Sequence, residues 1–325
     1  MRTIRIASIV CLFLLSTLSS LSEEFYITLY TIPPRNQIDF SSPRRMMVTS
    51  SLNAFSLHFS QRKHAMGHVF IELAGPEYST FVESVKRQLF ISGRKDVMNG
   101  YGLGILFAGI DGRLGFGNPI TKDLSHHYHN GKIAFIKAKI SEENFDRLTN
   151  YLEEYQERGY DRIYNGLNKP REGLGAGCSA FGVSFFEVAG ILQPGWEDSW
   201  VAEAKVPFHL IGGPTTGNIV ALSEVFIEKQ WAGGEEPFRL FRIIDPYLIF
   251  KWVNEKWTTL MTEDNSDSTA EIDGKLQVCP VMLGKARGLV YDFSEYPAPD
   301  EPIFFPPDQK LKDELLSGRF KQNDN

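Results

Sequence analysis

The alternation of hydrophobic and polar positions predicts short strands in the first half of the chain. Residues 25–32 and 132–140 alternate bulky or β-branched residues with polar ones, as half-buried strands do. Residues 69–73 and 79–85 flank a Gly-Pro pair at positions 75–76, which is a strong turn signal. These two segments therefore predict a β-hairpin.

Other stretches carry weaker patterns. Residues 45–60 are mixed in character and are interpreted as a further extended element. Residues 91–131 are rich in glycine and polar residues and predict a long loop region. Nearer the C-terminus, residues 219–226 and 238–244 predict short strands, and a proline-rich stretch at 296–307 leads into a charged tail.

Two helical patterns lie in the middle of the chain. Ser141 precedes a segment with carboxylates in its first turn and apolar residues at helical spacing, which predicts a capped helix to about Arg158 that ends at Gly159. The apolar face of this helix comprises Phe145, Leu148, Leu152 and Tyr155. From Cys178 to Leu192 the chain is apolar nearly all round, which predicts a helix buried in the centre of the fold.

The N-terminus has the pattern of a secretory signal. Arg2 and Arg5 precede an apolar run at residues 6–18, and small residues suited to cleavage follow. We interpret residues 1–22 as a signal peptide, so the mature protein is expected to be secreted or periplasmic. The apolar run is shorter than the ~20 residues that span a bilayer, and no later segment approaches that length. No stable membrane span is therefore expected after signal removal, and a retained anchor is the alternative.

Composition and charge narrow the function classes. The chain has 325 residues, 42% of them hydrophobic and 23% charged, which is typical of a globular protein. The net charge is −6, and lysine and arginine do not cluster into a stripe interleaved with aromatic residues. Nucleic-acid binding is excluded on these grounds, because it requires a basic footprint.

The candidate nucleophile is Cys178. It stands at the junction between a glycine-rich loop and the buried helix, where the unpaired N–H groups of a helix start favour a thiolate. Signal removal leaves only Cys279 as a second cysteine. In an oxidising compartment the alternative to a reactive thiol is a structural disulfide between these two residues.

The hairpin supplies a candidate base and a carboxylate to orient it. If the turn is centred between residues 75 and 76, facing residues have numbers that sum to 151, so His68 faces Glu83. Facing residues have Cβ atoms ~5 Å apart, close enough for a hydrogen bond between side chains. Glu72 is the rival on the same strand face, but four residues along a strand is ~13 Å. A register shift of one residue would move Glu83 to the other face, and His64 is then the reserve candidate for the histidine.

These residues resemble the circularly permuted NlpC/P60 cysteine hydrolases of the papain-like superfold, which include lecithin retinol acyltransferase-like and YiiX-like proteins. In that family a His-Val strand precedes the cysteine helix, as His68 and Val69 precede Cys178 here, and a polar residue on the next strand matches Glu83. The resemblance covers residues 60–192. About 95 residues separate Glu83 from Cys178, which admits a long insertion.

The resemblance implies an α+β fold with an antiparallel sheet packed on a central helix that carries Cys178. We expect the papain-like catalytic domain to span residues 23–255 and residues 256–325 to form a C-terminal extension, packed on that domain or partly flexible. The implied activity is cleavage of an amide bond, peptide or N-acyl, through a Cys178–His68–Glu83 triad and a thioacyl intermediate. The expected substrate is a peptide, a cell-wall component or an acylated small molecule, and no cofactor or metal is required.

Two alternatives to an amide hydrolase are open. One is an acyltransferase or esterase on the same fold, and the other is a non-catalytic secreted binding protein with a Cys178–Cys279 disulfide. Competing motifs are weaker. A loose GxGxxA pattern at residues 175–180 lacks the strand that a dinucleotide site requires. The three histidines His126, His127 and His129 lie in the predicted loop without a partner at metal-ligand spacing.

Overall fold

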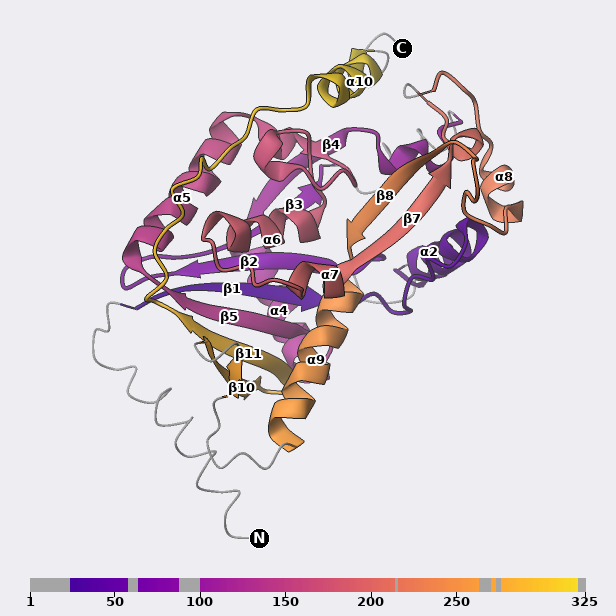
Figure 1. The fold of residues 1–325 in the computed structure, drawn as a ribbon. Helices are drawn as coiled ribbons and strands as arrows, with labels where there is room; N and C mark the ends of the chain where they lie inside the picture. The colour runs from indigo at the N-terminus through magenta and orange to yellow at the C-terminus, as the bar shows by residue number, and fades with distance from the viewer. Residues whose placement is uncertain are drawn as a thin grey trace.

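The computed structural model describes residues 24–57, 64–87, 100–213, 216–262, 270–272 and 276–320 (Figure 1). The predicted signal peptide at residues 1–22 lies outside the described residues. Among the helices that are described, none has the length and apolar character needed to cross a membrane.

A mostly antiparallel sheet forms the centre of this mixed α+β fold. Its described strands are β1 (Phe25–Ile32), β2 (His68–Ala74), β3 (Ser79–Lys86), β4 (Ile110–Phe116), β5 (Ala134–Ile140), β6 (Ile163–Tyr164), β9 (Ala270–Ile272), β10 (Leu276–Leu283) and β11 (Ala286–Phe293). They lie in the order β6-β4-β3-β2-β1-β5-β11-β10-β9. Strands β5 and β11 pair in parallel, and the other described neighbours pair antiparallel.

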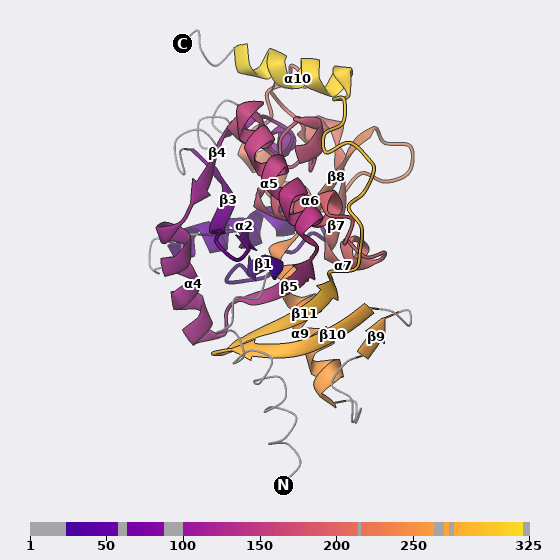
Figure 2. The same cartoon turned by 90° about the vertical axis from the view of Figure 1, so that its left-hand side faces the viewer.

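Helices cover both faces of this sheet, because successive side chains of a strand point to opposite sides. On β2, Val69 and Ile71 join the core that contains α5 (Glu142–Glu157) and α6 (Cys178–Val188). The intervening Phe70 packs with Ile120 and Leu124 of α4 (Asn118–Asn130). Figure 2 shows α4 on one side of the sheet and the pair α5 and α6 on the other.

A smaller lobe, called the α2 lobe below, lies beside one end of the sheet (Figure 1). It contains α2 (Pro43–Leu57), the short helix η1 (Leu103–Leu106), α8 (Leu222–Ile227) and a two-stranded sheet of β7 (Val201–Pro207) and β8 (Phe238–Ile244). The lobe has its own apolar core, made of Ile38, Met46, Leu103, Phe107, Ala204, Val206, Leu210, Ile211, Val220, Val225 and Phe241.

Several sequence predictions are confirmed. The strand at 25–32, the strand within 132–140, the hairpin and the strand at 238–244 are all present as β1, β5, β2–β3 and β8. Helix α5 begins after Ser141, whose hydroxyl accepts the Asn144 N–H at 3.2 Å, and Gly159 follows its end with a φ of 69°. The buried cysteine helix is α6, which ends at Val188, before the predicted limit.

The predicted extended element at 45–60 is wrong. The described part of this stretch lies in helix α2. Pro43 occupies the first helical position and the Ser42 hydroxyl accepts the Arg45 N–H at 3.2 Å, so a capping residue followed by proline begins the helix. Residues 58–60 lie outside the described residues.

The loop predicted at 91–131 is also wrong over its described part, because β4 and α4 lie there. Glycine inside β4 has a packing cause: a Cβ at Gly112 would lie 2.6 Å from the Asp161 carbonyl oxygen. The strand predicted at 219–226 is replaced by the short helix α8. Helices α7 (Trp196–Trp200), α9 (Pro246–Thr262) and α10 (Gln309–Phe320) were not predicted.

The chain beyond residue 255 contributes to the same fold. Helix α9 runs across that position, and β11 pairs with β5 in the central sheet. The proline-rich stretch then passes over α5 and α6, where the Arg171 guanidinium donates to the carbonyl oxygens of Ile303 at 2.9 Å and Pro302 at 2.7 Å. Phe304 packs on Tyr151 with ring centroids 5.3 Å apart.

Close packing of α6 on the sheet leads to a stability prediction. A Cβ at Gly182 would lie 2.6 Å from Cγ1 of Val69, so Gly182→Val is expected to lower the free energy of unfolding by about 1–3 kcal/mol through overpacking. Gly233→Ala is the control, because nothing lies within 4 Å of a Cβ there, and it is expected to change stability by less than about 0.5 kcal/mol. Denaturant unfolding measures both, and equal stabilities would contradict the tight contact.

Candidate active site

Cys178 is the first residue of α6 and is 7% exposed. Gly177 is the N-cap in extended conformation, and its carbonyl oxygen accepts the first helical bond, from the Phe181 N–H at 3.0 Å. A glycine at this position carries no side chain that could cap the free N–H groups. The thiol therefore lies at a helix start that no Gly177 side chain caps, where the partial positive charge of the helix favours a thiolate.

The hairpin register differs from the prediction. Observed pairs such as Ile71 with Val82 and Leu73 with Thr80 have numbers that sum to 153, not 151. The turn causes this difference. The Gly75 N–H donates to the Tyr78 carbonyl oxygen at 2.7 Å and closes the turn, so the centre of the turn lies one residue later than predicted. A change of two in the sum leaves every side chain on its predicted face. His68 and Glu83 are therefore diagonal neighbours rather than direct partners.

The diagonal arrangement joins the imidazole to the carboxylate. His68 Nε2 lies 2.6 Å from Glu83 Oε2, and His68 is 4% exposed. Gly115, opposite Glu83 on β4, leaves room for this carboxylate, because a Cβ there would lie 2.8 Å from Glu83 Oε1. Glu72 makes a different contact: it accepts the Tyr30 hydroxyl at 2.7 Å. Glu83 is therefore the carboxylate that orients His68.

The thiol of Cys178 meets the same imidazole. The pairing of β2 with β3 runs only from Ala74–Ser79 to Ile71–Val82, so the two strands are not paired beside His68. The sulfur lies there, close enough to the His68 ring and to the Val69 backbone N–H for both to lower the pKa of the thiol. Because Glu83 contacts Nε2, Nδ1 is the ring nitrogen left for the sulfur.

The electrostatics of the pair favour a thiolate and an imidazolium. Burial alone would raise the pKa of the Cys178 thiol, but the positive charge and hydrogen bond of His68 outweigh it and lower that pKa to about 7. Burial would likewise lower the pKa of His68, and the negative charges of Cys178 and Glu83 raise it to about 10. The thiol thus loses its proton at a lower pH than the imidazolium does.

Tyr164 completes the site and was not singled out from the sequence. Its hydroxyl donates to the Cys178 sulfur and accepts the Cys178 backbone N–H. Burial, followed by the negative charge of Cys178, raises the pKa of Tyr164 well above its ordinary value, so the hydroxyl keeps its proton. Tyr164 lies beside the thiol because β6 pairs with β4, where Tyr164 is opposite Ile110. No local sequence pattern predicts this pairing.

His64, the reserve histidine, lies against His68 instead of replacing it. The two imidazole rings are parallel within 2°, with centroids 3.9 Å apart. The His64 ring therefore covers one face of the His68 ring. His68 is the histidine that meets both the thiol and the carboxylate.

The other candidates from the sequence lie elsewhere. Of the two cysteines in the described chain, Cys178 lies on α6 and Cys279 on β10, and no disulfide joins them. His126, His127 and His129 lie on helix α4, not in a loop. Across the described ranges, no group of three or more histidine, cysteine, aspartate or glutamate side chains is placed to hold a metal ion.

An apolar pocket of about 300 Å³ opens beside the thiol, between the α2 lobe and the sheet. Its lining includes Met46, Met47, Leu103, Leu106, Ile110, Phe241 and Ile243, together with Cys178 and Tyr164. Most of the lining side chains carry no polar group. The pocket can therefore hold a hydrophobic substituent next to the sulfur.

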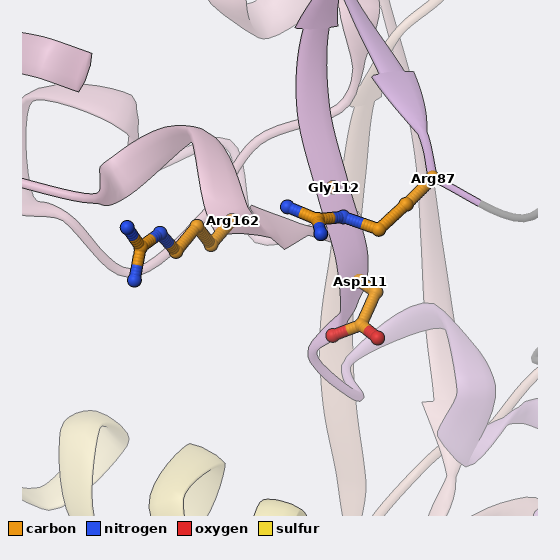
Figure 3. A pocket seen from close by; sticks show the side chains of 4 residues that line it. All are labelled: Arg87, Asp111, Gly112 and Arg162. Atoms are coloured by element: carbon orange, nitrogen blue, oxygen red, sulfur yellow. The ribbon is translucent and has the colours of Figure 1, made fainter.

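A second hollow of about 370 Å³ has a different character. It is lined by Arg87, Asp111, Gly112 and Arg162, and Figure 3 shows the Arg87 side chain crossing β4 at Gly112. Among its described lining residues, Asp111 is a carboxylate that could act as a base, but no thiol, hydroxyl or imidazole lies there to act with it. The candidate active site is therefore the group around Cys178.

Comparisons of the chain with protein-family models, with curated proteins and with solved structures find no match. The function proposed below consequently depends on the residues and geometry of the site.

Proposed function

We propose that this protein is a thiol-dependent hydrolase of the permuted papain-like type that cleaves an N-acyl amide bond through Cys178, His68 and Glu83. The observation that carries the proposal is the continuous contact from the Cys178 sulfur through the His68 ring to the Glu83 carboxylate, with 2.6 Å between His68 Nε2 and Glu83 Oε2. A nucleophile, a base and an orienting carboxylate in this sequence are the parts that acyl transfer requires.

The proposed reaction has two steps. The Cys178 thiolate attacks the substrate carbonyl carbon, and the tetrahedral intermediate collapses when the His68 imidazolium gives its proton to the departing amine. A thioester on Cys178 remains. Water then attacks the thioester carbonyl while His68 takes a proton from it, and the carboxylic acid leaves as the thiolate and imidazolium are restored.

The negative charge on the carbonyl oxygen needs hydrogen-bond donors. The Cys178 backbone N–H at the start of α6 is one donor, released when the carbonyl oxygen replaces the Tyr164 oxygen as its acceptor. The Tyr164 hydroxyl is the second donor, free to turn from the sulfur to the carbonyl oxygen once the sulfur has bonded to carbon. Both groups already lie around the sulfur, so a carbonyl bonded to that sulfur comes within their reach.

The apolar pocket supports an acyl substrate over a cell-wall peptide. Peptide backbones carry an N–H and a C=O at each residue, and these groups would lose their hydrogen bonds to water in a pocket lined by Met46, Leu103 and Phe241. A hydrocarbon chain has no such groups and gains free energy from burial there.

A series of fluorogenic N-acyl aminocoumarins, from acetyl to decanoyl, tests the proposal against a dipeptidyl aminocoumarin. We expect turnover that rises with acyl length and that is absent in Cys178→Ala. Turnover that persists in Cys178→Ala would contradict the mechanism. A preference for the dipeptidyl probe would contradict the acyl substrate while leaving the nucleophile in place.

Tyr164→Phe is expected to lower kcat about 100-fold, because the variant keeps the ring and removes one donor to the oxyanion. Tyr78→Phe is the matched control, since Tyr78 is 41% exposed in the hairpin turn and should leave kcat unchanged. Steady-state kinetics on the decanoyl probe measure both. Unchanged kcat in Tyr164→Phe would remove the tyrosine from the oxyanion site.

A further inference from the structure

Helix α2 has two different faces. Met46, Met47 and Ser50 point inward and line the apolar pocket. The opposite face carries Val48, Leu52 and Phe55, which are 39%, 55% and 64% exposed. Spacings of four and three residues place these three side chains in one stripe along the helix. The helix that walls the pocket thus presents a second apolar surface to the outside.

The surroundings extend this surface and place two arginines beside it. Helix α8 packs beside α2 (Figure 1), and its last residue, Ile227, is 73% exposed. Arg44 and Arg45 are exposed in the first turn of α2, on the same side as Val48, and Arg45 donates to the Asp39 carboxylate at 3.1 Å. This ion pair is itself exposed and therefore weak, so the Arg45 guanidinium can exchange Asp39 for a headgroup phosphate. The helix contains no acidic residue, whereas the whole chain has a net charge of −6. We call Arg44, Arg45, Val48, Leu52, Phe55 and Ile227 the α2 surface.

We propose that the α2 surface docks on an anionic lipid bilayer. This inference rests on the proposed function, because the apolar pocket behind α2 would take the acyl chain of the substrate from that bilayer. Exposed apolar side chains next to arginines are the combination by which a helix lies in a membrane interface: the apolar groups enter the acyl region and the guanidinium groups meet the headgroups. The fold needs no spanning helix for this.

A second copy of the chain fits the α2 surface less well. A stable protein interface takes ~20–30 residues from each partner. The α2 surface offers only four exposed apolar side chains and two arginines among its described residues, far fewer than such an interface needs. A bilayer imposes no such requirement of shape, because lipids rearrange around the side chains.

Flotation with vesicles of phosphatidylcholine containing a minority of phosphatidylglycerol tests the docking. The protein is taken from a host that processes its N-terminus, checked by mass spectrometry, because the apolar run at 6–18 would itself bind lipid. We expect the wild-type chain to float with the vesicles. Leu52→Ser combined with Phe55→Ser should weaken the partition by tenfold or more, because two apolar side chains no longer enter the bilayer.

The matched control changes the same kind of residue elsewhere. Met282 and Leu283, at the end of β10, are 52% and 42% exposed, and Met282→Ser with Leu283→Ser should float like the wild type. Arg44→Gln with Arg45→Gln should weaken binding several-fold on the anionic vesicles and leave binding to pure phosphatidylcholine unchanged. Hydrogen exchange in the presence of vesicles should show new protection at residues 43–57 and 222–227.

Three results would overturn the docking: no flotation of the wild type, equal flotation of all variants, or a drop in oligomeric mass of the Leu52/Phe55 variant without lipid, which would identify a second copy as the partner. The dissolved acetyl probe separates this failure from failure of the proposed function. Its turnover by a chain that does not bind vesicles would refute the docking alone. Vesicle binding through α2 by a chain that cleaves no probe would refute the hydrolase alone.

Discussion

Cys178→Ala is expected to reduce turnover of the decanoyl probe to the level of buffer, a loss of about 10⁴–10⁶-fold in kcat. Alanine removes the sulfur and leaves the helix start, the His68–Glu83 pair and the apolar pocket in place. The substrate should therefore still bind while no thioester forms. Mass spectrometry of the quenched reaction should show an acylated wild-type chain and an unmodified variant.

Cys279→Ala is the matched control for this loss. Cys279 lies half-buried on β10, away from α6, and the variant should keep wild-type turnover. Thermal unfolding of both variants excludes a general loss of folding. If Cys279→Ala were inactive while Cys178→Ala retained turnover, the nucleophile would have been assigned to the wrong cysteine.

Glu83→Gln is expected to lower kcat by about 10³–10⁴-fold, the size of effect seen when a neutral amide replaces the carboxylate of a triad. The carboxylate holds a proton on His68 Nε2 and leaves Nδ1 to accept the thiol proton. The substitution also removes the negative charge of Glu83, which together with Cys178 raises the pKa of His68. The pKa of His68 is therefore expected to fall. Steady-state kinetics across pH should show both the lower kcat and a falling limb moved to lower pH.

Glu72→Gln is the control that the hairpin itself offers. Glu72 is on the same strand as His68 but accepts the Tyr30 hydroxyl, so its variant should change kcat by only a few-fold. A large loss in Glu72→Gln with a normal Glu83→Gln would exchange the roles of the two carboxylates. Comparable, small losses in both would show that no carboxylate orients His68.

That Cys178, His68 and Glu83 lie together could be predicted from sequence because the position of each depends on a local pattern. Cys178 follows glycines and begins an apolar helix, and His68 and Glu83 lie in a two-strand hairpin whose faces follow from alternation. The exact register could not be predicted, since it depends on which residues close the turn. The numbers of facing residues sum to 153 rather than the predicted 151, and a difference of two leaves His68 and Glu83 on the same face of the hairpin. A difference of one would have placed them on opposite faces.

Tyr164 and the apolar pocket could not be predicted, because both depend on contacts between distant segments. Tyr164 is placed by the pairing of β6 with β4, and the pocket forms where α2, η1 and β8 meet the sheet. Helix α2 itself did carry a signal. Ser42 and Pro43 are a capping residue and a first-turn proline, and they outweighed the mixed pattern that followed.

The most direct test of the central claim, the Cys178–His68 ion pair, is the rate of iodoacetamide labelling of Cys178 as a function of pH, in the wild type and in His68→Ala. Only the thiolate reacts, so the rate should rise through a pKa of about 7 in the wild type and through a clearly higher pKa once the imidazolium is absent. Identical pH profiles for the two proteins, with a pKa at the ordinary thiol value, would contradict the pair.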